Sequence, residues 1–129
     1  MAKFLSPLIA QKLNGANWEI TSRLMYQSDL LKEVISIPVG FVTDFASVPR
    51  LPLAFLVAGD TCHEAAVIHD WLYQTHATTR KLSDRVLSEA MRATDVPSWR
   101  RLLIYSAVRS WGWIAWKSGP ERLTFLNPT

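Results

Sequence analysis

The chain has 129 residues and a mass of 14.6 kDa, the size of a single domain. Hydrophobic residues make up 49% and charged residues 19%, a balance that excludes intrinsic disorder. Cys62 is the one cysteine, so the chain holds no internal disulfide and no cysteine-rich zinc module. No apolar run reaches the roughly 20 residues of a membrane-spanning helix, and we therefore expect no transmembrane segment.

The net charge of +3 is unevenly distributed along the chain. Residues 1–79 carry five Lys or Arg against seven Asp or Glu, whereas residues 80–129 carry nine against four. A basic, tryptophan-rich second part suits contact with an anionic surface, and equally suits solvated helix faces over an aromatic core. Because no recognised nucleic-acid motif accompanies this charge, we do not expect nucleic acid as a partner.

The first 42 residues are predicted to form a small antiparallel sheet. Residues 4–13, the Asn14-Gly15 pair and the alternating apolar residues that follow predict a β-hairpin. Residues 31–42 are rich in β-branched side chains, and Pro38 confines them to a sheet edge or breaks the strand. Residues 43–60 contain several prolines and predict an ordered loop with a short helix near 51–57.

The remainder predicts three main helices, over about 61–75, 81–93 and 98–117, and a tail over 118–129. Thr61 and Glu64 have the spacing of a capping box, which indicates that the first of these helices begins there. A sheet followed by helices predicts an α+β fold, with residues 1–129 as a single domain.

Helix 61–75 is predicted to have an unusual polar face. At about 100° per residue, its aliphatic residues form one stripe, and the opposite side holds His63, Ala66, His69, Asp70 and Tyr73. An ordinary solvated face would carry Lys, Glu and Gln. Imidazole, carboxylate and phenol groups are instead the side chains of proton transfer and metal ligation.

A possible partner for this face lies on the next helix. Asp84 borders the apolar arc of helix 81–93, and a carboxylate at the border of a core needs a partner because burying it alone is costly. The short connector makes the two helices antiparallel neighbours. We therefore expect Asp84 to reach the His69 ring and fix its tautomer.

The string His69-Asp70-x-x-Tyr73, followed by an aspartate on the next helix, resembles the active-site helices of phospholipase A2, especially the viral capsid type. The resemblance implies catalytic roles for three residues: His69 as general base for water, Tyr73 as its support and Asp84 as the group that orients His69. It also implies calcium, with Asp70 as a ligand and Asp44 supplying further oxygens. The chain departs from that superfamily in lacking the Gly-rich calcium loop ahead of the helix.

A second resemblance covers about residues 35–112. Two long strings resemble a domain-of-unknown-function family that is frequent in tailed-phage and prophage genomes: Pro38-x-Gly40-Phe41-x-Thr43-Asp44-Phe45-Ala46-Ser47-Val48-Pro49-Arg50 and Ala65-Ala66-x-x-His69-Asp70-x-Leu72-Tyr73, with Arg80 and Asp84 after them. This resemblance implies a phage origin, with synthesis in the host cytoplasm and a place in the virion as one destination.

Two functions remain open. In the first, the protein hydrolyses an ester of a lipid or envelope component, and Arg80 binds an anionic group of the substrate. In the second, it is a non-catalytic virion (tail or head) or host-interaction protein, in which His69 donates to Asp84 and Asp70 pairs with Arg80 as structural contacts.

The last helix, 98–117, bears on both functions. Its aromatic and aliphatic residues are assigned mainly to core packing. Its combination of Trp and Arg also suits a docking surface for membrane lipid or for other phage or host proteins.

Overall fold

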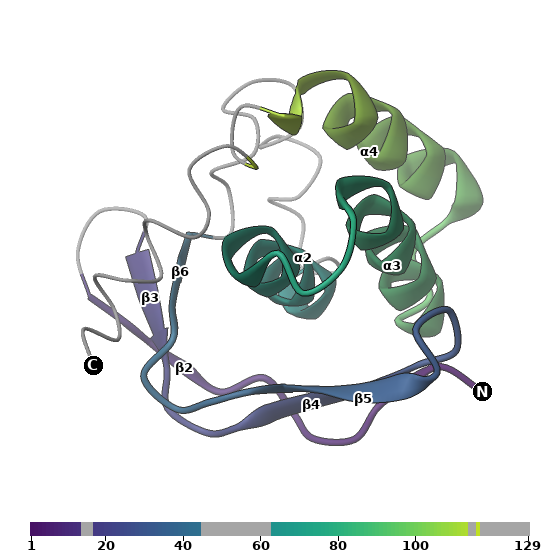
Figure 1. Ribbon diagram of the computed structural model, residues 1–129. Helices are drawn as coiled ribbons and strands as arrows, with labels where there is room; N and C mark the ends of the chain where they lie inside the picture. The colour runs from purple at the N-terminus through teal and green to yellow at the C-terminus, as the bar shows by residue number, and fades with distance from the viewer. Residues whose placement is uncertain (14–16, 45–62, 114–115, 117–129) are drawn as a thin grey trace.

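The structure is a computed structural model that describes residues 1–13, 17–44, 63–113 and 116. Within these ranges six strands precede three helices, which confirms the predicted α+β fold. Strands β4 and β5 lie beneath helix α2 in Figure 1, β3 and β6 lie to its left, and helices α3 and α4 lie on the far side of α2 from β6. The predicted short helix at 51–57, the capping residue Thr61 and the tail 118–129 lie outside the described residues.

The strands form two three-stranded antiparallel sheets, where the sequence predicted one sheet. The orders are β1-β4-β5 and β2-β3-β6, and the strands are β1 (Lys3–Phe4), β2 (Ala10–Lys12), β3 (Asn17–Ile20), β4 (Leu24–Ser28), β5 (Glu33–Ile37) and β6 (Val42–Asp44). The predicted hairpin is confirmed, since β2 pairs with β3 and Lys12 lies opposite Trp18. The chain changes sheet between β1 and β2, between β3 and β4 and again between β5 and β6, which local sequence patterns do not encode.

The turn between β5 and β6 positions the strand that reaches α2. Strand β5 ends at Ile37, directly before Pro38, as the sequence predicted. Gly40 has a φ of +98°, in the left-handed region that favours glycine. Its N–H donates to the Ile20 carbonyl at 2.8 Å, and the Ile20 N–H donates to the Phe41 carbonyl at 2.9 Å. These two bonds fasten the turn to the end of β3 and start β6 in register.

The helices are α2 (His63–Thr75), α3 (Arg80–Ala93) and α4 (Ser98–Trp111). The Thr79 hydroxyl caps α3 by accepting a hydrogen bond from the Leu82 N–H at 3.1 Å. The regular part of α4 ends at Trp111, but Trp113 and Trp116 are also helical, and the Trp116 N–H donates to the Gly112 carbonyl at 3.0 Å. The predicted end at 117 lies outside the described residues.

Helix α2 is buried on both of its faces. It packs against α3 on one side and against β5 and β6 on the other. Its aliphatic stripe joins a core that also includes side chains from both sheets and from the other two helices: Ile20, Leu24, Ile35, Ile37, Ala65, Val67, Ile68, Leu72, Val86, Met91, Ile104 and Val108. The polar face predicted from the sequence is also turned inward, toward α3 and β6.

Helix α4 is apolar on two opposite faces. Ile104 and Val108 lie in the core, as predicted. Trp99, Leu102 and Leu103 are instead 61%, 65% and 48% exposed, so the core assignment is wrong for them. They lie on the outer face because α3 covers only the opposite side of the helix. In the part of the chain that the structure describes, no helix is long and apolar enough to span a bilayer.

A carboxylate of α3 joins the helices to the sheet β1-β4-β5. Glu89 accepts hydrogen bonds from the Tyr26 hydroxyl at 2.7 Å and the Ser28 hydroxyl at 2.9 Å through Oε1, and from the Leu30 N–H at 2.9 Å through Oε2. Burial, and then the hydrogen bond to Glu89, raise the pKa of Tyr26 well above its ordinary value, so its hydroxyl stays a donor.

We predict that Glu89→Ala lowers the free energy of unfolding by about 2–3 kcal/mol, because it leaves two hydroxyls and an N–H without their acceptor. Urea denaturation measures this change. Glu33→Ala is the matched control, since Glu33 is an exposed acid at the start of β5, and we expect a change within about 0.5 kcal/mol. Equal losses in the two variants would contradict the structural role of Glu89.

Candidate functional site

The carboxylate of Asp84, on α3, is at the centre of the candidate site and is completely buried. Its Oδ1 lies 2.7 Å from Nε2 of His69 and accepts a hydrogen bond from the Tyr73 hydroxyl at 2.5 Å. His69 and Tyr73 are one turn apart on α2, so both side chains point to the same side of that helix. The predicted contact between Asp84 and His69 is therefore present, and Tyr73 shares the same oxygen.

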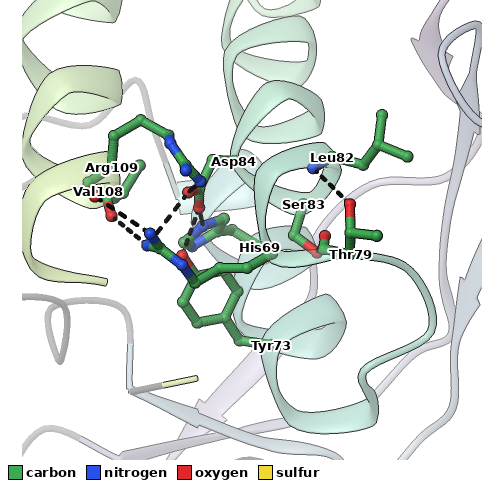
Figure 2. A network of polar contacts seen from close by, with 9 residues as sticks. His69, Tyr73, Thr79, Leu82, Ser83, Asp84, Val108 and Arg109 are labelled. Atoms are coloured by element: carbon green, nitrogen blue, oxygen red, sulfur yellow. Dashed lines mark hydrogen bonds and ion pairs between the residues drawn. The ribbon is translucent and has the colours of Figure 1, made fainter. Parts of the chain in front are cut away.

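The second oxygen of Asp84 faces two guanidinium groups. Arg109 Nη1, from α4, lies 2.7 Å from Oδ2, and Arg80 Nη1 lies 3.7 Å from it. Figure 2 shows His69 and Tyr73 approaching the carboxylate from α2 and Arg109 approaching it from α4. The buried carboxylate thus has partners on three helices. A buried carboxylate is tolerated when opposite charges and hydrogen-bond donors surround it in this way.

These partners determine the ionisation of Asp84. Burial alone would raise its pKa, but the hydrogen bond and charge of His69, together with Tyr73 and Arg109, outweigh burial and lower the pKa below its ordinary value. Asp84 is therefore a carboxylate at neutral pH. Burial, and then the bond to Asp84, raise the pKa of Tyr73 far above its ordinary value, so the phenol remains a donor.

An ionised Asp84 also fixes the tautomer of His69. A carboxylate only accepts hydrogen bonds, so Nε2 of His69 must carry the proton that it donates. In the neutral ring Nδ1 then holds the lone pair, and no hydrogen bond to Nδ1 is present among the described residues. Such a nitrogen is a proton acceptor, which is the state that general-base chemistry requires. The His69 side chain is 5% exposed.

Asp70, the predicted calcium ligand, joins α2 to β6. Its Oδ2 accepts a hydrogen bond from the Thr43 hydroxyl at 2.7 Å, and its Oδ1 accepts one from the Gln74 amide at 3.0 Å. The side chain of Asp44, the second predicted ligand, lies outside the described part of the structure. Among the residues that the structure does describe, no three His, Cys, Asp or Glu side chains are close enough to hold a metal ion.

Arg80, the predicted substrate-binding residue, holds the end of α4. Its Nη1 and Nη2 donate to the carbonyls of Val108 and Arg109 at 3.1 and 3.3 Å. The acid beside it is Asp84, one turn along α3, so the predicted ion pair of Arg80 with Asp70 is wrong. The two carboxylates of the helix pair therefore have different partners, and Arg80 belongs to the Asp84 cluster, which we define as His69, Tyr73, Arg80, Asp84 and Arg109.

Sequence reasoning missed the contribution of α4 to this cluster. Arg109 appeared only as an interruption of the apolar run of the last helix. The sequence did contain an indication, since Arg109 directly follows Val108, which packs in the core. A charge at the border of a core needs a partner. Gly112, at the end of α4, lies against the Tyr73 hydroxyl and the Arg80 guanidinium.

Comparison with family models matches residues 18–108 to a protein family of unknown function, DUF1353. The chain belongs to the DUF1353 family. The match runs from β3 to Val108 in α4, so it includes His69, Tyr73, Arg80 and Asp84 and ends one residue before Arg109. It overlaps the region of about 35–112 that the sequence strings indicated and begins earlier. Searches of curated proteins and of solved structures found no match.

We predict that Asp84→Asn lowers the free energy of unfolding of this DUF1353 protein by about 3–5 kcal/mol at neutral pH, because it removes the charge that its partners surround. The lowered pKa of Asp84 predicts a second effect, on the pH dependence of stability. The stabilisation from Asp84 is present above its ordinary pKa of 3.8 and is lost as the pH falls from there through the folded-state pKa. Unfolding of the wild type over this acid range should therefore show a pH dependence that Asp84→Asn reduces.

Asp95→Asn is the matched control for this experiment. Asp95 is exposed in the turn after α3 and has a positive φ that asparagine also adopts readily. An equal change of the acid dependence in the two variants would contradict the assignment to Asp84.

We also predict that Gly112→Ala lowers the free energy of unfolding by about 1–3 kcal/mol through overpacking. A Cβ at this position would lie 2.5 Å from the Tyr73 hydroxyl, 3.3 Å from Arg80 Nη1 and closer still to the Val108 carbonyl. Thermal and urea unfolding measure the loss. Ser110→Ala, at an exposed position near the end of α4, is the control and should change stability by no more than about 0.5 kcal/mol.

Proposed function

We propose that this protein is a hydrolase in which His69 is the general base for a water molecule and the bond cleaved is an ester of a lipid or another envelope component. The observation that carries the proposal is the 2.7 Å contact between His69 Nε2 and a fully buried Asp84. In the neutral imidazole this contact places the ring proton on Nε2 and leaves the lone pair on Nδ1.

The proposed reaction begins when Nδ1 of His69 takes a proton from water as the water oxygen attacks the ester carbonyl carbon. The carbon–oxygen bond to the alcohol then breaks, and the proton on Nδ1 passes to the leaving alkoxide. Asp84 remains ionised throughout and stabilises the imidazolium that forms between the two transfers. Tyr73 and Arg109 are positioning residues, because they hold the Asp84 carboxylate and do not act on the substrate.

Two features support a lipid or envelope substrate. The His69-Asp70-x-x-Tyr73 string and the following Asp84 resemble the active-site helices of phospholipase A2, including the aspartate and tyrosine that accompany the histidine. The outer face of α4 exposes Trp99, Leu102 and Leu103, side chains that favour the interface of a membrane. The phage-like strings support a phage origin, with synthesis in a bacterial host and action on its envelope.

A second candidate function is a non-catalytic virion or host-interaction protein. The observation that favours it is the burial of the cluster: the His69 side chain is 5% exposed and Asp84 is not exposed at all. In that case the contacts of Asp84 serve only to hold α2, α3 and α4 together. The exposed face of α4 would then dock on another phage or host protein.

The experiment is hydrolysis of phospholipid vesicles by the wild type and by His69→Gln, each with and without calcium. Removal of a general base should lower the rate at least about a hundredfold. His63→Gln is the matched control, because His63 is on the same helix and outside the Asp84 cluster, and it should retain the wild-type rate. Dependence of the wild-type rate on calcium tests the predicted metal.

Equal background rates in the wild type and His69→Gln would exclude this activity. A stability loss in His69→Gln together with those background rates would establish the structural alternative. Tyr73→Phe separates the two roles further, since it removes one hydrogen bond to Asp84 and keeps the imidazole in place.

A further inference from the structure

A pocket of about 800 Å³ lies beside α3, and Asp84 is not among the residues that line it. It lies between the C-terminal half of α3, the first turns of α4 and the loop after β4, and it shares no residue with the Asp84 cluster. Its volume is within the range of small-molecule sites in proteins, about 300–1,000 Å³. The pocket is therefore a separate site from the residues proposed to carry out hydrolysis.

Three arginines line the pocket. Arg85 and Arg92 are two turns apart on α3 and so point to the same side, and Arg101 comes from α4. Arg101 donates through Nε to the Val96 carbonyl at 3.1 Å, which positions its guanidinium and leaves its two NH₂ groups available. Among the described residues none of these arginines forms an ion pair with an acid.

The acids of the same pocket are engaged elsewhere. Both oxygens of Glu89 accept hydrogen bonds, Oε1 from hydroxyls of β4 and Oε2 from the Leu30 N–H in the turn after it. Asp29 accepts a hydrogen bond from the Ala2 N–H at 2.9 Å. Asp95 is the remaining acid at the pocket, and its carboxylate would weaken the binding of an anion. The pocket therefore contains guanidinium groups that form no ion pair among the described residues. Most of its carboxylates already accept hydrogen bonds from the protein's own N–H groups and hydroxyls.

We propose that this pocket binds a phosphoryl group, from either a soluble phosphate compound or the headgroup of an anionic lipid. Guanidinium groups match the oxygens of a phosphoryl group in geometry and in charge, and two or three of them converging on one pocket bind it with charge-assisted hydrogen bonds. The proximity of Asp95 predicts binding that tightens when that charge is removed.

Isothermal titration with inorganic pyrophosphate tests the proposal on the full chain. We expect Arg85→Ala and Arg92→Ala each to raise the Kd about tenfold or more. Lys81→Ala is the matched control, since Lys81 is an exposed cation on α3 outside the pocket, and it should leave the Kd unchanged. Asp95→Asn should lower the Kd about twofold to fivefold.

Flotation with phosphatidylcholine vesicles that contain phosphatidic acid identifies the source of the phosphoryl group. Flotation that pyrophosphate displaces supports the lipid headgroup, and pyrophosphate binding without flotation supports a soluble compound. Absence of pyrophosphate binding, or a Kd that the arginine variants leave unchanged, overturns the proposal. His69→Gln should bind pyrophosphate like the wild type, so failure of the hydrolase proposal is measured separately.

Discussion

The carboxylate of Asp84 is the constraint on which the helical half of the protein depends. Removing an ionised carboxylate from water costs several kcal/mol, and the protein offsets this cost with hydrogen-bond donors from the neighbouring helices. His69 and Tyr73 supply them from α2, and Arg109 supplies one from α4. Because each donor must stand within hydrogen-bond distance of the same two oxygens, the positions of α2 and α4 relative to α3 are fixed together.

The same contacts have a chemical consequence. In the neutral ring, an ionised acceptor at Nε2 keeps the proton of His69 on that nitrogen and leaves the lone pair on Nδ1. Stability and reactivity therefore depend on one group, and a substitution of Asp84 changes both. A loss of activity can therefore be distinguished from a loss of stability only when rates and unfolding free energies are measured on the same variants. The variant that distinguishes them most directly is His69→Gln.

Helix α4 contributes side chains both to the Asp84 cluster and to the pocket beside α3. Arg109 belongs to the Asp84 cluster, and Arg101 lines the pocket beside α3. The outer face of the helix exposes Trp99 and Leu102. Gly112 lets the end of α4 approach the Tyr73 hydroxyl, a distance that a side chain would prevent. The position of this helix thus affects both the candidate active site and the pocket.

The sequence by itself determined the element types, the hairpin of β2 and β3, the break at Pro38 and the pairing of Asp84 with His69. These depend on local periodicity and on the rule that a carboxylate at the border of a core needs a partner. Only the tertiary structure decided that the strands form two sheets, that Arg109 completes the cluster, and that Asp70 accepts a hydrogen bond from Thr43. Those outcomes depend on which distant segments pack together, and helical or strand periodicity shows which face of an element is apolar but not which neighbour covers it.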